Sequence, residues 1–280
     1  MKKLTFFTLI LTAGALFSCQ QDTDTFDDAA LAELDLESEL AAESSMEEVD
    51  LIAEAGMETF YESSDGRFGR DEILDCAEVT RDTVNKIVTI DYGDGCEGPG
   101  GSIKSGKIII EYNDHKYVPG AYRIITFENF YIDSIHVEGV RTLTNTTDST
   151  STLQFEVTLV GGKLTFPDET TYTRDSELIR TWFRADDRVD DYSTLEGEAA
   201  GENRRGVDYS MEIIEPLVFK RSCRNGRVVV PVSGIIQKTV GDHVVTIDFG
   251  DGECDNIAVV TINGVSKRVF IYPRGRRLLG

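Results

Sequence analysis

The chain is poor in basic residues, histidine and tryptophan, and it has no apolar run long enough to cross a membrane. It contains 28 Lys and Arg against 50 Asp and Glu, so its formal charge at pH 7 is -22. Such an acidic surface repels nucleic acid and anionic lipid head groups, which excludes nucleic acid as a partner. Cationic molecules and divalent ions remain as possible partners of this surface. The simpler interpretation is that the acidic surface is solvated and has no partner.

Known catalytic motifs are also missing. His115, His136 and His243 lie far apart in sequence, and the chain has no Gly-x-Ser-x-Gly, no His-Glu-x-x-His and no P-loop. Carboxylates are so abundant that any pair could be imagined as a glycosidase dyad, so none is informative. The sequence therefore favours a non-enzymatic binding or structural role. A hydrolase of envelope or dietary polymers with an unrecognised carboxylate site is the alternative.

Residues 1–19 have the three parts of a secretory signal. Two lysines precede the apolar run Leu4 to Phe17, which is too short to span a bilayer. Leu16-Phe17-Ser18-Cys19 resembles the lipobox of bacterial lipoproteins, and this resemblance implies that Cys19 is lipidated and becomes the first residue of the mature chain. Removing the two lysines takes the formal charge from -22 to -24. A cleaved signal without lipid and an uncleaved anchor are the alternatives.

Residues 20–66 contain 16 Asp and Glu and no Lys or Arg. The stretch from Gln20 to Asp28 resembles the Gln-rich, then acidic signals that send lipoproteins of Bacteroidota to the cell surface, which favours a surface-exposed outer-membrane lipoprotein over a periplasmic one. Because this segment has few aromatics and little to bury, we predict a mostly disordered tether with one or two short, marginal helices between about 29 and 62. Its removal should leave the rest folded.

Residues 67–280 are predicted to form one β-rich domain. A strand-turn-strand stretch occurs twice, as Ile87-Val-Thr-Ile-Asp-Tyr-Gly-Asp-Gly-Cys96 and as Val244-Val-Thr-Ile-Asp-Phe-Gly-Asp-Gly-Glu-Cys254. The many alternating runs, the short turns and the lack of long amphipathic helices predict an all-β fold. We expect an antiparallel meander that forms a strongly curved sheet or an open barrel.

Two local features follow from the same alternation. The run from Tyr122 to Thr144 is long for one strand, so it should bend or bulge near Asn129 or Gly139. The run that begins at Leu153 should turn at Gly161-Gly162 into a second strand.

Four cysteines follow Cys19. Counting outward from a turn that places Val84 opposite Ile87 puts Cys76 within disulfide reach of Cys96. The same residue count does not place Cys223 directly opposite Cys254. Four cysteines allow three pairings, and the repeat favours the pairing within each copy. Zinc is the rival interpretation, and neither the spacing nor a neighbouring histidine supports it.

The repeated Asp-x-Gly-Asp-Gly stretch also raises the question of calcium. It supplies carboxylates at Asp91, Asp94, Asp248 and Asp251, and oxygen ligands suit hard cations. The full Asp-x-Asp-x-Asp-Gly loop with a distant Glu is absent. Asp and Gly also suit tight turns, so we favour a role of these aspartates in stabilising the turns. Apart from the calcium alternative, we expect no cofactor.

The order of motifs looks like that of a group of Bacteroidota cell-envelope lipoproteins with paired Ile-Asp-Phe/Tyr-Gly-Asp-Gly motifs followed by Cys. The resemblance covers about residues 76 to 272 and implies an envelope location, and it implies no activity. It rests on these stretches: Ile90-Asp-Tyr-Gly-Asp-Gly-Cys96, Gly106-Lys-Ile-Ile-Ile110, Ile125-Thr-Phe-Glu-Asn-Phe-Tyr131, Val137-Glu-Gly139, Gly162-Lys-Leu-Thr-Phe-Pro167, Arg180-Thr-Trp182, Ile247-Asp-Phe-Gly-Asp-Gly252, Cys254-Asp-Asn256 and Val260-Thr-Ile-Asn-Gly264.

The partners expected are the membrane, through the lipid anchor, and a glycan or an envelope protein. Exposed aromatic side chains on a smooth sheet would support such binding, with Tyr112, Tyr117, Tyr131 and Trp182 as candidates. Three Asp-Ser/Thr-small-apolar triplets resemble the sites at which Bacteroidota attach O-glycans, and they place candidate glycans on Thr83, Ser134 and Ser149.

Overall fold

The computed structural model describes residues 35–59, 72–98, 101–148, 152–226 and 230–271. Within these residues the chain forms a 14-stranded antiparallel sheet and one long helix, α2 (Leu36–Glu58), with short 3-10 turns η1 (Glu72–Leu74), η3 (Arg188–Asp190) and η4 (Arg221–Gly226). The strands are β1 (Glu78–Asp82), β2 (Ile87–Asp91), β3 (Cys96–Glu97), β4 (Ile103–Tyr112), β5 (Tyr122–Ile132), β6 (Ile135–Asn145), β7 (Leu153–Thr165), β8 (Thr171–Phe183), β9 (Tyr192–Glu202), β10 (Asp208–Lys220), β11 (Ser233–Val240), β12 (His243–Asp251), β13 (Ile257–Ile262) and β14 (Val265–Phe270).

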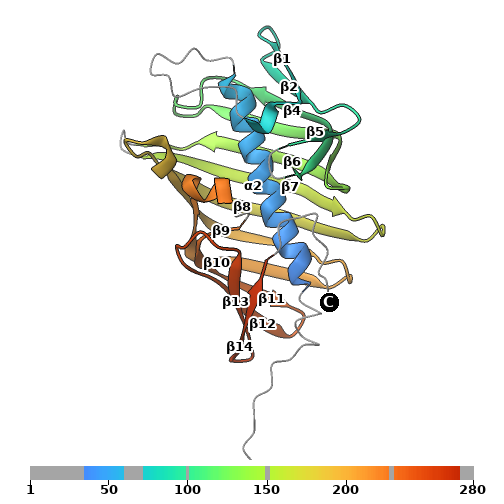
Figure 1. Ribbon diagram of the computed structural model, residues 1–280, viewed down its shortest axis with the longest axis vertical. Helices are drawn as coiled ribbons and strands as arrows, with labels where there is room; N and C mark the ends of the chain where they lie inside the picture. Colours follow the sequence, from blue (N-terminus) through green and yellow to red (C-terminus); the bar gives the residue numbers. More distant parts are fainter. Residues whose placement is uncertain (1–34, 60–71, 99–100, 149–151, 227–229, 272–280) are drawn as a thin grey trace, which may run out of the picture.

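The sheet is a meander, because strands that follow one another along the chain are neighbours from β1 to β14, with the short β3 paired to β4 off this path. The predicted antiparallel meander is therefore confirmed. The sheet is neither closed nor strongly curled, so the expected strong curvature or open barrel is wrong. Figure 1 shows the physical reason: α2 runs across the strands on one face of the sheet. Because the sheet buries its apolar face against this helix, it does not have to close into a barrel in order to bury that face.

Alternation along the strands creates the two faces. In β7, Phe155, Val157 and Leu159 are buried, whereas Glu156 and Thr158 between them are exposed or half-buried. In β2, the buried Ile90 lies against the helix, since a Cβ added to Gly56 of α2 would come within 2.4 Å of Ile90 Cδ1. The inner face of the sheet is therefore the one that α2 covers, and the outer face carries the polar residues.

A bend or bulge was expected near Asn129 or Gly139; the run from Tyr122 to Thr144 is irregular at both places and also contains a turn that the sequence did not show. Asn129 has a positive φ of 47° and lies against Gly106, where an added Cβ would sit 1.9 Å from the Asn129 carbonyl oxygen. The register shifts again at Gly139. Between them, Asp133 and Ser134 both have positive φ and form a two-residue hairpin turn that separates β5 from β6.

The turn predicted at Gly161-Gly162 is wrong. Strand β7 continues through both glycines to Thr165, with a register shift opposite β8 between Leu159 and Gly162. Gly161 has a φ of 62°, and its N–H donates to Asp175 Oδ1 at 2.6 Å. The two glycines thus form a bulge inside one long strand, which the same residues can do as readily as a turn.

Helix α2 is the largest correction. The acidic segment was predicted to be a disordered tether with marginal helices, yet Leu36–Glu58 forms a 23-residue helix in which Val49 and Ile52 are fully buried. Its side chains find their partners on the sheet, so the helix does not depend on its weak intrinsic stability. The expected domain limits at residues 19 and 66 lie outside the described residues. In the part of the chain that the structure covers, no helix has the length and apolar content to cross a membrane.

Candidate functional site

The polar residues that the fold brings together lie between α2 and the inner face of the sheet. Six carboxylates of α2 follow each other at intervals of three or four residues, so they share one side of the helix. The helix itself contains no basic residue. We call the contact between these acids and the strand cations the α2–sheet ionic interface. Its acids are Glu39, Glu43, Glu47, Asp50, Glu54 and Glu58, with Glu48 beside them, and its cations are Lys104, Lys116, Arg123, Arg141, Arg174, Arg180 and Lys238.

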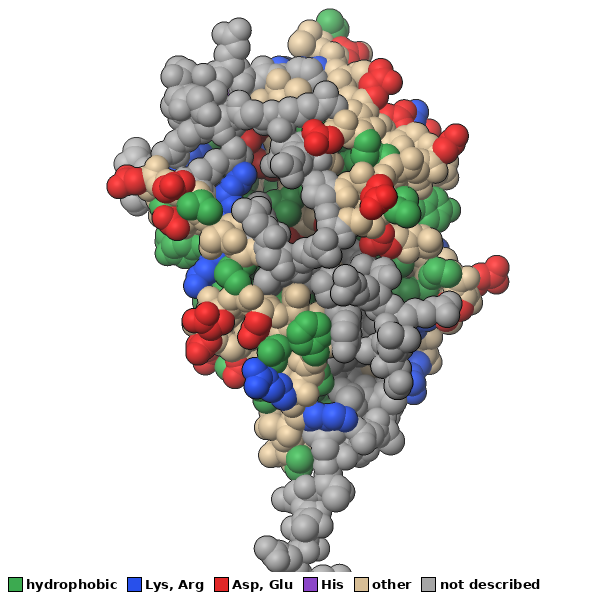
Figure 2. All heavy atoms as spheres, in the orientation of Figure 1, with side chains coloured by type: hydrophobic (Ala, Val, Ile, Leu, Met, Phe, Trp, Pro, Cys, Tyr) green, Lys and Arg blue, Asp and Glu red, His purple; other side chains and the backbone are tan. Residues whose placement is uncertain are grey.

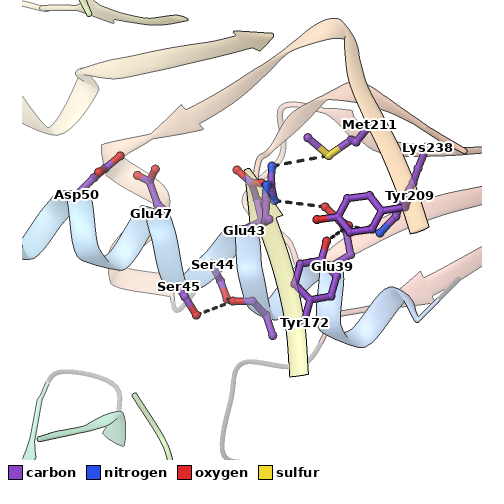
Figure 3. A network of polar contacts seen from close by, with 12 residues as sticks. Glu39, Glu43, Ser44, Ser45, Glu47, Asp50, Tyr172, Tyr209, Met211 and Lys238 are labelled. Atoms are coloured by element: carbon purple, nitrogen blue, oxygen red, sulfur yellow. Dashed lines mark hydrogen bonds and ion pairs between the residues drawn. The ribbon is translucent and has the colours of Figure 1, made fainter. Parts of the chain in front are cut away.

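The most buried part of this interface surrounds Glu39 (Figure 3). The Glu39 carboxylate accepts hydrogen bonds from Lys238 Nζ and, at 2.6 Å, from the Tyr172 hydroxyl. Arg174 Nη1 lies 3.4 Å from Glu39 Oε1 and 3.1 Å from Glu43 Oε2. In Figure 3, Tyr172, Tyr209 and Lys238, which come from β8, β10 and β11, lie around Glu39 of α2. Two carboxylates and two cations thus form a neutral, buried cluster.

The charges in this cluster set the ionisation of its members. Burial raises the pKa of Glu39, but the charges of Lys238 and Arg174 outweigh burial and bring the pKa from 4.5 down to about 2. Burial, and then the negative charge of Glu39, raise the pKa of Tyr172 and of Tyr209. Glu39 is therefore an anion and both tyrosines are neutral over the whole physiological range.

Asp50 is the centre of the middle part of the interface. Arg141 donates to both of its oxygens, at 2.6 Å from Nε and 2.8 Å from Nη2, and Arg180 Nη2 lies 3.6 Å away. Burial raises the pKa of Asp50, but the charge and hydrogen bonds of Arg141 outweigh this and lower it. Arg180 also donates to Glu47 at 2.7 Å. Such a planar, paired geometry fixes both the position and the rotation of the helix.

The end of α2 that follows Asp50 is more open to water. Glu54 pairs with Lys116 and, at 2.9 Å, with Arg123, and Glu58 lies 3.0 Å from Lys116. Glu48 pairs with the buried Lys104 at 2.7 Å. The side chains of Glu48 and Glu54 are 23% and 25% exposed, so solvent screens these pairs more than it screens the pairs of Glu39 and Asp50.

The interface explains why six basic residues of this acidic chain are buried. Figure 2 shows acidic side chains spread over both flanks of the viewed face, whereas Lys and Arg are visible in few places. Four arginines and two lysines on the strands instead point inward and are buried: Arg123, Arg141, Arg174, Arg180, Lys104 and Lys238. Because an unpaired buried charge is costly, the sheet needs the acidic helix in order to bury these residues.

Both predicted disulfides are present. Cys76 joins Cys96 and Cys223 joins Cys254. The register that led to the first pairing was two residues off, because Asp82 and not Val84 lies opposite Ile87. A four-residue turn replaces the expected tight one, and the Asp82 carboxylate caps it by accepting from the N–H groups of the next residues. A shift of two keeps every side chain on its face, so the bridge still forms.

The aspartates of the repeated turns act as turn acceptors. Asp91 Oδ1 accepts from Gly93 N at 2.8 Å, and Asp248 Oδ1 accepts from Gly250 N at 2.8 Å. Asp94 and Asp251 are exposed beside them. Among the residues that the structure describes, no group of three or more His, Cys, Asp or Glu side chains is arranged to hold a metal. The hydrogen bonds of Asp91 and Asp248 match turn chemistry.

The other predicted sites are dispersed. Thr83 and Ser134 are exposed in turns, whereas Cys19 and Ser149 lie outside the described residues. The structure does not gather the histidines: His136 stacks on Tyr131 on the outer face, and burial followed by the charge of Arg123 lowers the pKa of His115. The candidate aromatics are Tyr112, which is buried, Trp182, which is half-buried, and Tyr117 and Tyr131, which are exposed.

The α2–sheet ionic interface itself was missed in the sequence, although a signal for it exists. Acids recur with helical spacing in a segment without cations, and basic residues occupy strand positions whose alternation points inward, such as Arg141 between Gly139 and Leu143. The spacing of the acids alone, or the inward positions of the basic residues alone, has an ordinary explanation. Only the two patterns together indicate a buried contact between the helix and the sheet.

Comparisons of this chain with known protein families, with curated proteins and with solved structures give no match.

Proposed function

We propose that the chain is an exported lipoprotein, anchored through Cys19 in the outer membrane and exposed at the cell surface, whose folded part binds an envelope partner or glycan. The observation that carries export is the pair of disulfides in a chain that begins with a secretory signal pattern. Disulfides persist in oxidising compartments outside the cytoplasm, so they support this half of the proposal independently of the signal.

Binding is favoured over catalysis by what the buried polar groups do. The perturbed carboxylates Glu39 and Asp50 are ones that a search for a catalytic site would select first. Both carboxylates form ion pairs with buried cations of the sheet, and the described residues show no cleft beside either of them. They hold the helix in place, which is a structural task.

The outer face of the sheet is then the surface left for a partner. It carries two cross-strand aromatic pairs, Tyr131 with His136 and Phe183 with Tyr192, whose ring centroids are 4.6 Å apart in each pair. Tyr131 and Tyr192 are exposed. Rigid aromatic surfaces of this kind contribute contact area at little entropic cost, which suits the binding of proteins and of sugar rings.

Metabolic labelling with palmitate tests the anchor. The wild-type chain should incorporate label and fractionate with membranes, and Cys19→Ser should lose both properties, with labelling of an unrelated lipoprotein as the control. Proteinase added to intact cells should then degrade the anchored protein if it is surface-exposed. Unchanged labelling in Cys19→Ser would contradict lipidation at this residue.

The binding surface needs a separate experiment. Protein purified from its native membrane should bring down the same partner from repeated preparations, and Tyr131→Ser with Tyr192→Ser should reduce that partner's yield at least tenfold. Val84→Ser, an exposed residue in a turn far from these aromatic pairs along the sheet, is the matched control. Equal recovery with all variants would contradict binding through the outer face.

A further inference from the structure

Lys238 and Glu39 form a lysine–carboxylate pair that is closed to solvent on both sides. Lys238 is 0% exposed and Glu39 is 1% exposed. The Tyr209 ring lies beneath the amine, with its centroid 3.8 Å from Nζ, and stacks on Tyr172 at 5.3 Å. The amine and the carboxyl are hydrogen-bonded to each other and fixed from all sides by side chains of β8, β10 and β11.

The charge balance of the cluster permits these two groups to react. Glu39, Glu43, Arg174 and Lys238 together carry two negative and two positive charges. Condensation of the Glu39 carboxylate with the Lys238 ammonium group releases one water and removes one negative and one positive charge. Arg174 and Glu43, 3.1 Å apart, remain as a neutral pair. The product therefore leaves no buried charge uncompensated and removes the desolvation cost of two buried ions.

We propose that the Glu39 carboxyl and the Lys238 amine condense to an amide that joins α2 covalently to β11. The proton of the ammonium first moves along the hydrogen bond to the carboxylate, which gives a neutral acid and a neutral amine. The Nζ lone pair then attacks Glu39 Cδ and forms the C–N bond. The remaining oxygen, Oε1, gains negative charge, which the Arg174 N–H group stabilises, whereas the Tyr172 O–H donates to Oε2, the oxygen that leaves as water. A proton passes from nitrogen to the hydroxyl, the C–O bond breaks and one water leaves.

The ion pair is the resting form, because the charges of Lys238 and Arg174 stabilise the Glu39 carboxylate, and the condensation proceeds through the minor neutral form of the pair. Proton transfer within the pair changes no net charge, and a dry, low-dielectric site reduces the advantage that two separate ions enjoy in water. The fixed geometry supplies the high effective concentration of one group at the other. Exclusion of solvent keeps the water that would hydrolyse the amide away from the site.

Other lysine pairs of the interface lack these conditions. Lys104 is buried, but its partner Glu48 is 23% exposed, and Lys116 and its partner Glu54 are both partly exposed. Water reaches these carboxylates, so we expect no amide there. Lys104 thus provides an internal control in the same molecule.

The amide has a mechanical consequence. Glu39 and Lys238 are 199 residues apart in the chain. A bond between them makes the helix inseparable from the sheet under acid, high salt or pulling force, which the surrounding ion pairs alone do not achieve.

Peptide mapping of the full-length protein, denatured and with its disulfides reduced, tests the proposal. Trypsin cleaves after lysine only when the side-chain amine is free. The expected result is no cleavage after Lys238, together with a branched peptide that contains residues 228–267 joined through Lys238 to the peptide of Glu39. Its mass is the sum of the two peptides less one water. Cleavage after Lys104 should proceed normally.

Lys238→Arg is the matched variant, because it keeps the positive charge beside Glu39 and cannot form this amide by the proposed route. Trypsin should cut at position 238 in this variant, and the branched peptide should vanish. Release of the peptide 239–267 from the wild-type protein in the same yield as cleavage after Lys104, without any branched peptide, would overturn the proposal. So would protection of Lys238 without a branched peptide.

Discussion

Arg141 on β6 and Asp50 on α2 form a two-point ion pair, with 2.6 Å from Nε to Oδ1 and 2.8 Å from Nη2 to Oδ2, and neither side chain is more than 5% exposed. The two residues are 91 positions apart. An ion pair this deep contributes little over an apolar contact of the same shape, but it is costly to break. It therefore specifies where the helix sits.

Asp50→Asn should reduce the free energy of unfolding by about 3 to 5 kcal/mol, because it leaves Arg141 buried without its counter-charge. Guanidinium-induced unfolding measures this difference. Glu128→Gln is the matched control, since Glu128 is exposed and 4.0 Å from Lys107, and its loss should change the free energy by no more than about 0.5 kcal/mol. Equal effects of the two substitutions would show that the Asp50 pair is not buried as described.

Removal of the Arg141 cation together with the Asp50 carboxylate should restore part of the free energy of unfolding that is lost when Asp50 alone is replaced. Asp50→Leu combined with Arg141→Met should be more stable than either single variant, because the two apolar side chains fill the space without a stranded charge. The coupling energy from the double-mutant cycle should exceed about 1 kcal/mol. Additive effects would contradict a direct contact.

Deletion of residues 36–58 should prevent cooperative folding. The deletion uncovers Ile90 and its neighbours and leaves the inward cations without partners, which reverses the expectation from sequence that the β domain folds alone. We expect binding of a hydrophobic dye and loss of the sharp unfolding transition. A peptide of residues 35–59 added in trans should restore the transition, and the same peptide with Glu39→Gln and Asp50→Asn should not.

In the ion-paired form, before Glu39 and Lys238 condense, acid should destabilise the protein between about pH 4.5 and pH 2. The folded pKa of Glu39 is about 2, below its ordinary value of 4.5, so its contribution is complete above pH 4.5 and is lost as the pH falls through 2. The lowered pKa of Asp50 acts in the same direction. The total loss attributable to Glu39 is on the order of 3 kcal/mol. Stability measured against pH should fall less steeply in Glu39→Gln, whereas an unchanged slope would contradict the assignment.

Two tyrosines should resist ionisation until the protein unfolds. Tyr172 and Tyr209 have raised pKa values, so their stabilising contribution is present at pH values below 10 and is lost as the pH rises beyond it. Ultraviolet titration should show a late step that coincides with unfolding by circular dichroism. Tyr172→Phe with Tyr209→Phe should remove that step, and Tyr131→Phe, at an exposed site, should not.

Each disulfide should stabilise the fold by a similar amount. The Cys76–Cys96 loop spans 20 residues and the Cys223–Cys254 loop spans 31, for which loop-closure entropy predicts about 3 to 4 kcal/mol each. Replacing both cysteines of one pair by serine should lower the free energy of unfolding by this amount under oxidising conditions. Under reducing conditions the wild-type protein and both double variants should converge.

Much of the sheet was predictable because its signals are local. The alternation of Leu153 to Leu159, the repeated strand-turn-strand stretch and the pairing of Cys76 with Cys96 need only nearby residues to be recognised. The errors within the sheet arose at turns. Asp133-Ser134 makes a tight turn without the expected Asn-Gly or Gly-Gly, whereas Gly161-Gly162 has the composition of a turn and forms a bulge.

The sequence predicted one or two marginal helices between about 29 and 62, but the length and stability of α2 could not be predicted from its own residues. An acidic segment without cations and with few aromatics satisfies the ordinary description of a disordered tether. What orders it is a set of inward-pointing cations, of which Lys238 follows Glu39 by 199 residues and Arg141 follows Asp50 by 91. Without the strand order, nothing in the sequence shows that these cations share one face of one sheet. Helix α2 is thus a tertiary feature, and its local propensity gives no sign of its stability.

Hydrogen exchange of the amides in Leu36–Glu58 tests the central claim most directly. If α2 is fixed on the sheet by buried ion pairs, its amides should exchange as slowly as those of β6 and β8, and Asp50→Asn should accelerate exchange throughout the helix. Exchange of these amides at the rate of an unstructured peptide, beside slow exchange in the strands, would show that the segment is a free tether and would contradict the account.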